Sequence, residues 1–269
     1  MRVRPGRLVL LGHPVAHSLS PRFQNAALAA ARIDLTYEAI DVAPADLRSI
    51  ASVLAEQAGA GNVTVPHKIA FAALCTERTA LAERVGAVNT FWTNEDGGLV
   101  GDNTDVGGIH AAVHDLLGTP PARTRVTLLG AGGSAAAVCA AAESWSGAPM
   151  RCWSRRPKQA RLLAHRFDGT VESVSDLADA VRGSALVINA TPIGMIREDF
   201  PVPFELLAPD AAVLDLVYRV GETPWVRAAR LRGHLASDGL PMLLAQGALA
   251  FERWFGVPPD RAAMRASLA

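Results

Sequence analysis

The chain has 269 residues, which is enough for one large domain or two modest ones. Half of the residues are hydrophobic, and 26 Lys plus Arg balance 26 Asp plus Glu, so the formal net charge is zero. This composition fits a packed globular protein and gives no indication of a nucleic-acid or membrane surface as the partner.

The first half of the chain alternates predicted strands with predicted helices. Apolar or alternating runs predict strands at residues 8–11, 36–42, 62–65 and 88–93. Ser20 followed by Pro21 is a helix-start signal, with the hydroxyl as the cap, and the helix continues through residues 23–31. A second helix is expected over residues 44–57, ended by Gly59, and residues 95–98 form a turn.

The second half repeats this rhythm more regularly. Strands are expected at residues 125–129, 150–153, 170–174, 185–189 and 213–217. Helices are expected at residues 134–145 and 158–167, from residue 175, and at 240–255. Such a βαβα order predicts an α/β fold with a parallel sheet covered by helices on both faces. We expect two lobes with a cleft between them, one formed by residues 1–105 with 240–269 and the other by residues 106–239.

A glycine-rich turn predicts a dinucleotide site in the second lobe. Gly130, Ala131, Gly132, Gly133 and Ser134, followed by an alanine, form a G-x-G-x-x-A turn between a strand and a helix. Glycine lets the backbone approach a pyrophosphate, and the helix N-terminus presents unpaired N–H groups to it. A tight turn without a ligand is the plainer interpretation, but the strand–turn–helix context favours a Rossmann-type site.

The next predicted strand indicates which cofactor is bound. An NAD site usually places Asp or Glu there, yet no acidic residue lies between Glu143 and Asp168. The strand is followed instead by Ser154, Arg155, Arg156, Pro157 and Lys158. Cations at this position suit the 2′-phosphate of NADP, since a guanidinium can bind it with two hydrogen bonds.

Short polar patches in the first half resemble the signatures of the shikimate dehydrogenase family. They are G-H-P-V-A-H-S-L-S-P from Gly12, N-V-T-V-P-H-K from Asn62, G-A-V-N-T from Gly86 and D-N-T-D from Asp102. The resemblance continues in the same order through Gly130–Ser134, N-A-T-P-I-G-M from Asn189, D-L-V-Y from Asp215 and G-L-P-M-L-L-A-Q from Gly239. It implies reduction of 3-dehydroshikimate to shikimate by NADPH, in aromatic amino-acid precursor biosynthesis.

The resemblance also implies roles for individual residues. Lys68 and Asp105 are the expected catalytic pair. Ser18 and Ser20 are expected to bind the substrate carboxylate, and its ring hydroxyls are assigned to Thr64, Asn89, Tyr218 and Gln246. Thr191, Leu216 and Gly239, in the later motifs, are expected to contact the cofactor together with the glycine turn and the basic segment.

The chemistry supports this assignment independently for Lys68. Reduction of a ketone needs a hydride, which a nicotinamide supplies, and a proton at the carbonyl oxygen. An ammonium group can polarise that carbonyl, and a carboxylate such as Asp105 can hold the ammonium in place. Which of the two moves the proton stays open. Taken alone, Lys68 could be a surface lysine, and Asp105 and Ser20 could be helix caps.

Some features leave alternatives open. The family usually has Asn-Arg-Thr where this chain has Ser154-Arg155-Arg156, and Gln159 occupies a position that is often arginine. One alternative is therefore a quinate or shikimate dehydrogenase that uses NAD. Another is a sensor of the same fold that binds shikimate-like ligands without turnover. A dehydrogenase of folate-linked one-carbon units is a more distant possibility.

The remaining expectations concern metals, partners and location. Hydride transfer needs no metal, and the histidines near the motifs lack metal-site spacing. Cys75, Cys139 and Cys152 are far apart, which argues against a disulfide framework and for a reducing compartment. With Gly12-His13-Pro14 interrupting the first apolar run, no signal peptide is expected, so we predict a cytoplasmic protein that is a monomer or homodimer.

Overall fold

The computed structural model describes residues 5–122, 124–146 and 150–269. The basic start of the chain, residues 1–4, lies outside these ranges. The chain divides into two compact units, residues 1–107 with 243–269 and residues 108–242. The boundaries fall within helices α5 (Asp105–Leu117) and α10 (Leu240–Phe255), so each of these helices belongs partly to both units.

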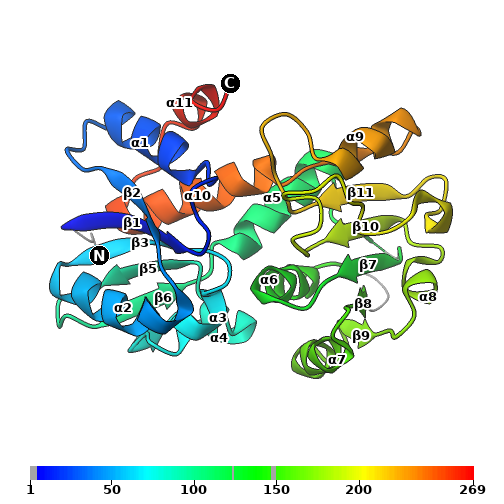
Figure 1. Cartoon of the computed structure of the whole chain (residues 1–269), viewed down its shortest axis with the longest axis horizontal. Helices are drawn as coiled ribbons and strands as arrows, with labels where there is room; N and C mark the ends of the chain where they lie inside the picture. Colours follow the sequence, from blue (N-terminus) through cyan, green and yellow to red (C-terminus); the bar gives the residue numbers. More distant parts are fainter. Residues whose placement is uncertain (1–4, 123, 147–149) are drawn as a thin grey trace. The chain divides into compact units, whose positions relative to one another are not determined.

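The first unit contains a mixed six-stranded sheet (Figure 1). Its strand order is β2 (Tyr37–Asp41), β1 (Arg7–Gly12), β3 (Gly59–Val63), β5 (Thr90–Thr93), β6 (Leu99–Asp102) and β4 (Glu77–Arg78). The prediction of a parallel sheet is wrong for this half, because β5 runs antiparallel to both β3 and β6. The turn at residues 95–98 is too short for a crossover, so it returns the chain as a hairpin.

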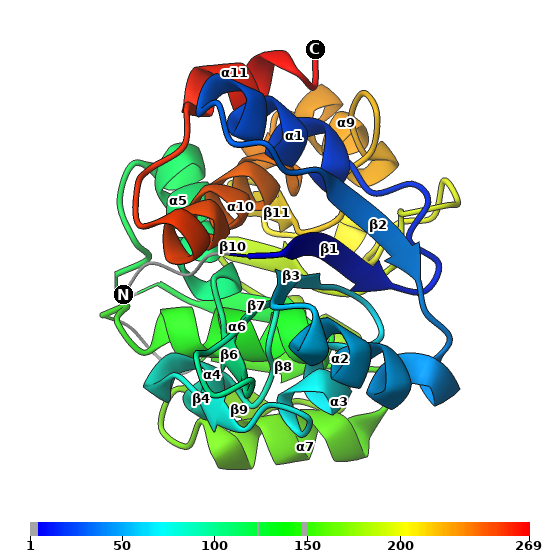
Figure 2. The same cartoon turned by 90° about the vertical axis from the view of Figure 1, so that its left-hand side faces the viewer.

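Helices cover both faces of this sheet. They are α1 (Ser20–Ala30), the 3₁₀ turn η1 (Pro44–Asp46), α2 (Leu47–Glu56), α3 (Lys68–Ala72), α4 (Ala80–Val85), α11 (Arg261–Ala266) and parts of α5 and α10. In both views, α1 and α11 lie together on one side of β1 and β2, and α2 lies on the other (Figures 1 and 2). The core on the α2 side joins Leu54 and Phe71 to Val9, Val63 and Phe91.

Three local predictions in this unit need correction. Ser20 is not the helix cap: Leu19 occupies that position, and the Ser18 hydroxyl accepts a hydrogen bond from the Ser20 backbone N–H. The helix expected over residues 44–57 is split into η1 and α2, and Gly59 begins β3 instead of ending the helix. The strand expected at residues 62–65 is β3, which the structure places at Gly59–Val63.

The second unit contains a sheet that is parallel throughout. Its order is β12 (Ala236–Ser237), β11 (Ala212–Asp215), β10 (Leu186–Asn189), β7 (Val126–Leu129), β8 (Met150–Trp153) and β9 (Val171–Ser173). Its helices are α6 (Gly133–Ala142), α7 (Pro157–Arg166), α8 (Leu177–Val181), η2 (Phe204–Leu206) and α9 (Pro224–Leu231). Figure 1 shows α6 and α8 on opposite sides of this sheet, as the βαβα pattern predicts.

The strand order of the second unit predicts the position of a ligand site. The chain leaves β7 toward β8 on one side and later returns to β10 on the other side of β7. The order of a doubly wound sheet reverses at such a point, and ligands bind outside the carboxyl ends of the strands there. The predicted glycine turn follows β7 directly, so the fold places it at this position.

Two further predictions concern the cysteines and membrane-spanning helices. The three cysteines are buried and carry free thiols. Among the described residues, no helix has the length and apolar composition needed to cross a membrane.

Candidate active site

The mixed sheet of the first unit brings three motifs to one edge. Because β5 is antiparallel to β3, the start of β5 lies beside the end of β3, with Thr90 opposite Asn62. The end of β6 lies beside the same point, with Asp102 opposite Thr90. The segments that follow β3 and β6 carry Lys68 and Asp105. In a purely parallel sheet, the start of β5 with Asn89 and Thr90 would lie at the opposite edge from the segments that follow β3 and β6.

Lys68 and Asp105 form a short ion pair. Lys68 is the first residue of α3, Asp105 is the first residue of α5, and Nζ lies 2.6 Å from Oδ2. The side chains are 12% and 4% exposed, so the pair is largely removed from water while the ammonium keeps limited access. A pair this poorly solvated needs good geometry to be tolerated, and the second carboxylate oxygen is also satisfied. The Asp105 side chain therefore serves Lys68 rather than capping α5.

A buried amide connects this pair to the last long helix. Asn89 Nδ2 donates to Asp105 Oδ1 at 2.8 Å and lies 3.1 Å from Gln246 Oε1 on α10. Asn89 Oδ1 accepts from the Thr104 backbone N–H at 2.7 Å. Asn89 and Gln246 are buried, so their hydrogen bonds fix their orientation. Four of the predicted site residues, Lys68, Asn89, Asp105 and Gln246, are thus one connected group.

Further polar residues complete this network, and the sequence interpretation gave none of them a role. Thr90 Oγ1 accepts from Asn62 Nδ2 at 3.0 Å, and the Tyr37 hydroxyl donates to Asn62 Oδ1 at 2.7 Å. Thr90 and Thr104 share a 2.8 Å hydrogen bond. All of them except Tyr37 lie in the motifs quoted above. Their position in these motifs was the feature of the sequence that could have identified them.

The predicted carboxylate-binding serines lie on the segment that follows β1. Ser18 is half-buried in the loop, and Ser20 is buried in the first turn of α1. Thr64 follows the neighbouring strand β3, and a Cβ on Gly12 would lie only 2.5 Å from the Thr64 methyl group. The close approach of these two segments requires glycine at position 12. The carboxyl ends of β1 and β3 therefore meet at this edge.

A second pair of side chains anchors the serine loop. His13 Nδ1 lies 2.5 Å from Asp41 Oδ1, and Asp41 Oδ2 accepts from the Val15 backbone N–H at 3.2 Å. The hydrogen bond with His13 holds the pKa of the Asp41 carboxyl below its ordinary value. His67 is buried and bonds through Nε2 to the Val42 carbonyl at 2.7 Å, so it has a packing role.

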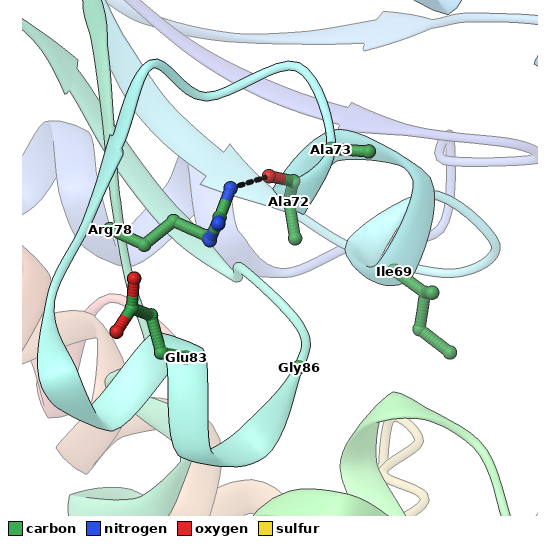
Figure 3. Close-up of a pocket in the computed structure, with 6 residues that line it drawn as sticks. All are labelled: Ile69, Ala72, Ala73, Arg78, Glu83 and Gly86. Carbon is green, nitrogen blue, oxygen red and sulfur yellow. Dashed lines mark hydrogen bonds between the residues drawn. The ribbon is translucent and has the colours of Figure 1, made fainter.

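An open hollow of about 400 Å³ is lined by residues of α3 and α4 and of the segments that follow them (Figure 3). Arg78 closes one side of it by donating to the Ala72 carbonyl at 2.9 Å, and Glu83 and Ile69 also line it. None of the residues predicted for substrate or cofactor belongs to its lining. The predicted site is thus built at the strand ends rather than in this hollow.

In the second unit, the glycine turn has a backbone conformation that favours glycine and leaves open space at the start of α6. Gly130 has φ of 112°, a left-handed conformation that favours glycine, and a Cβ there would lie 2.9 Å from the Ala190 carbonyl oxygen. Gly132 precedes α6 without a side-chain cap, and the space that its Cβ would occupy is open. The space beside the first turn of α6, here called the cradle, is therefore open, and a larger residue at position 132 would occupy it.

The basic segment follows β8, beside this turn. The Ser154 hydroxyl accepts from the Arg156 backbone N–H at 3.2 Å, which shapes the start of α7. Arg155, Arg156 and Lys158 are exposed. No ion pair occupies them within the described part of the chain. Cations left unpaired at a helix N-terminus oppose its dipole, which favours an anion as their partner.

The later motifs line the same end of the second sheet. Thr191 follows β10, and its methyl group would lie 3.2 Å from a Cβ on Gly130. Leu216 and Tyr218 follow β11, and the Gly239 backbone N–H donates to the Val217 carbonyl at 2.8 Å. The predicted residues thus form two sets, one in each unit, and Tyr218 belongs to the second.

Across the described ranges, no group of three or more His, Cys, Asp and Glu side chains is arranged to hold a metal ion.

Comparison with known proteins gives consistent matches along the chain. A family model for the shikimate dehydrogenase substrate binding domain matches residues 10–91, and one for the shikimate 5'-dehydrogenase C-terminal domain matches residues 239–269. The protein named shikimate dehydrogenase (NADP(+)) in Rubrobacter xylanophilus is 42% identical over 268 residues, covering 97% of this chain and 94% of that one.

Solved structures agree with the sequence matches. The Thermus thermophilus shikimate 5-dehydrogenase, in complex with NADP(H) and shikimate, superposes with a TM-score of 0.86 at 36% identity, covering 97% of this chain and 98% of that chain. The Corynebacterium glutamicum quinate dehydrogenase, in complex with NAD, gives a TM-score of 0.87 at 28% identity and covers 97% of each chain. The fold is therefore shared by enzymes that differ in substrate and cofactor.

Proposed function

Because the chain belongs to the shikimate dehydrogenase family, we propose that it reversibly reduces 3-dehydroshikimate to shikimate with NADPH, a step in aromatic amino-acid precursor biosynthesis. The observation that carries the proposal is the connected group of Lys68, Asp105, Asn89 and Gln246. It offers a cation held by a buried carboxylate and amide groups that can bind hydroxyls. We assign residues 1–105 with 240–269 to the substrate and residues 106–239 to the cofactor.

The catalytic role of Lys68 follows from its surroundings. Asp105 Oδ2 holds Nζ at 2.6 Å, so the remaining N–H bonds of the ammonium are directed by that contact. An N–H aimed at the substrate carbonyl oxygen stabilises the negative charge that develops there and places a proton at that atom. Asp105 keeps the ammonium oriented, and its Oδ1 is held in turn by Asn89.

Substrate binding is assigned to hydroxyl and amide groups, most of them in the same unit as this pair. Ser18 and Ser20 would donate to the carboxylate, while Thr64, Asn89, Gln246 and Tyr218 would bind the ring hydroxyls. A site built from such groups rejects ligands that lack the matching hydroxyl, because its own buried groups would then be unpaired.

The cofactor assignment is supported by the cradle at the start of α6 and by the exposed cations after β8. When bound, NADPH supplies the hydride. Gly130, Ala131, Gly132, Gly133 and Ser134 would receive the pyrophosphate, and Arg155, Arg156, Lys158 and Ser154 would receive the 2′-phosphate. Thr191, Leu216 and Gly239 would line the rest of the cofactor site. A cytoplasmic location and a monomeric or homodimeric state are further parts of the proposal.

The test is an assay of the purified protein with shikimate or quinate against NADP or NAD, followed by nicotinamide absorbance. We expect the highest kcat/KM with shikimate and NADP. Higher efficiency with quinate and NAD would favour the alternative within the same family. Binding of shikimate without any turnover would favour a ligand sensor. The Lys68→Ala variant, purified identically, controls for a contaminating dehydrogenase.

A further inference from the structure

A buried carboxylate in the second unit has no place in the proposed chemistry. Asp215 is the last residue of β11, and its side chain is fully buried. Its Oδ1 accepts from Asn189 Nδ2 at 2.8 Å and from the Val217 backbone N–H at 3.1 Å, and its Oδ2 accepts from the Thr223 hydroxyl at 2.8 Å. One side chain therefore joins the segments after β10 and β11 to the start of α9.

The contact with Asn189 fixes the loop that carries Thr191. A carboxylate only accepts hydrogen bonds, so the Asn189 NH₂ group must face Asp215 and its oxygen must face away. That oxygen accepts from the Thr191 backbone N–H at 3.0 Å and from the Thr191 hydroxyl at 2.7 Å. Thr191 is thus held by Asp215 through a single intervening side chain.

The contact with Val217 fixes the neighbouring loop. Val217 lies between Leu216 and Tyr218, and the Leu216 backbone N–H donates to the Asn189 carbonyl at 2.9 Å. The Val217 carbonyl in turn accepts from Gly239, where a Cβ would lie only 2.4 Å from the Leu216 oxygen. Both loops are therefore bonded to the same carboxylate, the loop after β11 directly and the loop after β10 through Asn189, and Gly239 packs against the loop after β11.

Burial of the Asp215 carboxylate costs folding free energy, which a packing role alone does not explain. Burial raises its pKa to about 6, although hydrogen bonds from Thr223, Val217 and Asn189 act against the shift. The charged group that acts on it is another carboxylate, Asp238, which raises the pKa further. The cap of α9 does not need it, since the Thr223 hydroxyl itself accepts from the Val226 N–H.

We propose that Asp215 is a positioning residue for the cofactor: it holds the segments 189–194 and 216–218 in the conformation in which Thr191 and Leu216 contact NADPH. The proposal rests on the cofactor role assigned to those segments above. It assigns no contact between Asp215 and the cofactor. Its effect passes through Asn189 on one side and Val217 on the other.

The experiment compares four variants with the wild type. Asp215→Ala removes all three contacts. Asn189→Ala leaves the contacts of Asp215 with Val217 and Thr223 in place but removes the bonds of Asn189 to Thr191, to Asp215 and to the Ile193 carbonyl. Asp215→Asn is the rescue variant, because its oxygen can still accept from Asn189 and Val217 while its NH₂ donates to Thr223. Thr223→Val removes the α9 contact but leaves both loops bonded, so it controls for loss of stability. NADPH binding is followed by the fluorescence of NADPH itself.

We expect Asp215→Ala and Asn189→Ala to weaken NADPH binding by about tenfold to a hundredfold, since small misplacements carry costs of this order. Asp215→Asn and Thr223→Val should stay within about threefold, with Thr223→Val less stable to heat. If Asp215→Ala does not fold, Asn189→Ala decides the question. Affinity within threefold in the folded alanine variants, or an equal loss in Thr223→Val, would overturn the proposal.

Amide hydrogen exchange separates this proposal from the proposed function. Residues 190–194 and 216–221 should exchange faster in Asp215→Ala than in Thr223→Val. If wild-type protein binds no NADPH, the cofactor assignment fails, and the exchange result still decides whether Asp215 fixes the loops. Equal exchange in the two variants would show that it does not.

Discussion

Replacing Asp215 with asparagine should raise the free energy of unfolding, and by more at neutral than at acidic pH. Burial raises the pKa of this carboxyl from 3.8 to about 6. Between those two values the folded chain binds more protons at this group than the unfolded chain does. The free energy of unfolding therefore falls as the pH rises through the window, and the penalty is complete above it.

The size of the effect follows from the shift. Roughly two pKa units correspond to about 3 kcal/mol. About 2 kcal/mol of this loss in the free energy of unfolding occurs between about pH 4.5 and about pH 7.5. The asparagine side chain cannot ionise and can keep the same three partners, with the Thr223 hydroxyl as acceptor. The variant should thus gain about 2 kcal/mol over the wild type across this range.

Urea unfolding of both proteins at several pH values measures this difference. Other titrating groups are shared, so they cancel when the two proteins are compared at each pH. Asp210→Asn is the matched control, because Asp210 is exposed just before the amino end of β11. Its effect should stay within about 0.5 kcal/mol. A wild-type-to-variant difference that is constant with pH, or that shrinks as the pH rises, would refute the reasoning.

Three other predictions concern the proposed site. Lys68→Ala should lower kcat by about 10² to 10⁴ while shikimate still binds, and steady-state turnover within threefold of wild type would remove Lys68 from the mechanism. Ser18→Ala and Ser20→Ala should each raise KM for shikimate about tenfold or more, since a hydrogen bond to a charged group contributes about 1.5–3 kcal/mol. A change in the NADPH constant instead would show that these hydroxyls do not bind the carboxylate. Arg155→Ala should weaken NADPH by about ten- to a hundredfold and leave NADH unaffected, and Arg156→Ala should act in the same direction but less strongly. An unchanged ratio of kcat/KM for the two cofactors in the double variant would contradict the assignment.

The sequence was most informative where local pattern and fold agree. The strands of the second sheet and the glycine turn after β7 could be predicted, because apolar runs alternate with helical segments and Gly130 begins the turn. The direction of β5 could not. The pattern of residues 88–93 predicts a strand but not its direction. The short hairpin to β6 and the pairing with β3 determine the direction of β5.

Contacts between side chains that are distant in the sequence could not be predicted from local patterns either. Lys68 and Asp105 are 37 residues apart, and Asn189 and Asp215 are 26 apart. The resemblance suggested the first pair, but no local pattern reports burial or the partner of a carboxylate. The role of Ser18 in shaping the start of α1 was missed for a related reason. A serine before a proline predicts a cap, yet the cap position depends on how the preceding loop enters the helix.

The two units use the same arrangement of groups for different purposes. In each, a buried carboxylate accepts from an asparagine NH₂, and the asparagine oxygen accepts from a threonine backbone N–H: Asp105, Asn89 and Thr104 in one, Asp215, Asn189 and Thr191 in the other. Because the carboxylate cannot donate, the amide in each case has a single satisfied orientation.

The two buried carboxylates differ in the charged group beside them. Asp105 faces Lys68, so its charge holds the ammonium group to which we assign the catalytic role. Asp215 is acted on by another carboxylate instead, and its charge is used only to orient N–H and O–H groups. A neutral acceptor can therefore replace Asp215, whereas Asp105→Asn would leave Lys68 without its counter-charge. Loss of turnover in Asp105→Asn with NADPH binding retained in Asp215→Asn is the outcome this difference requires.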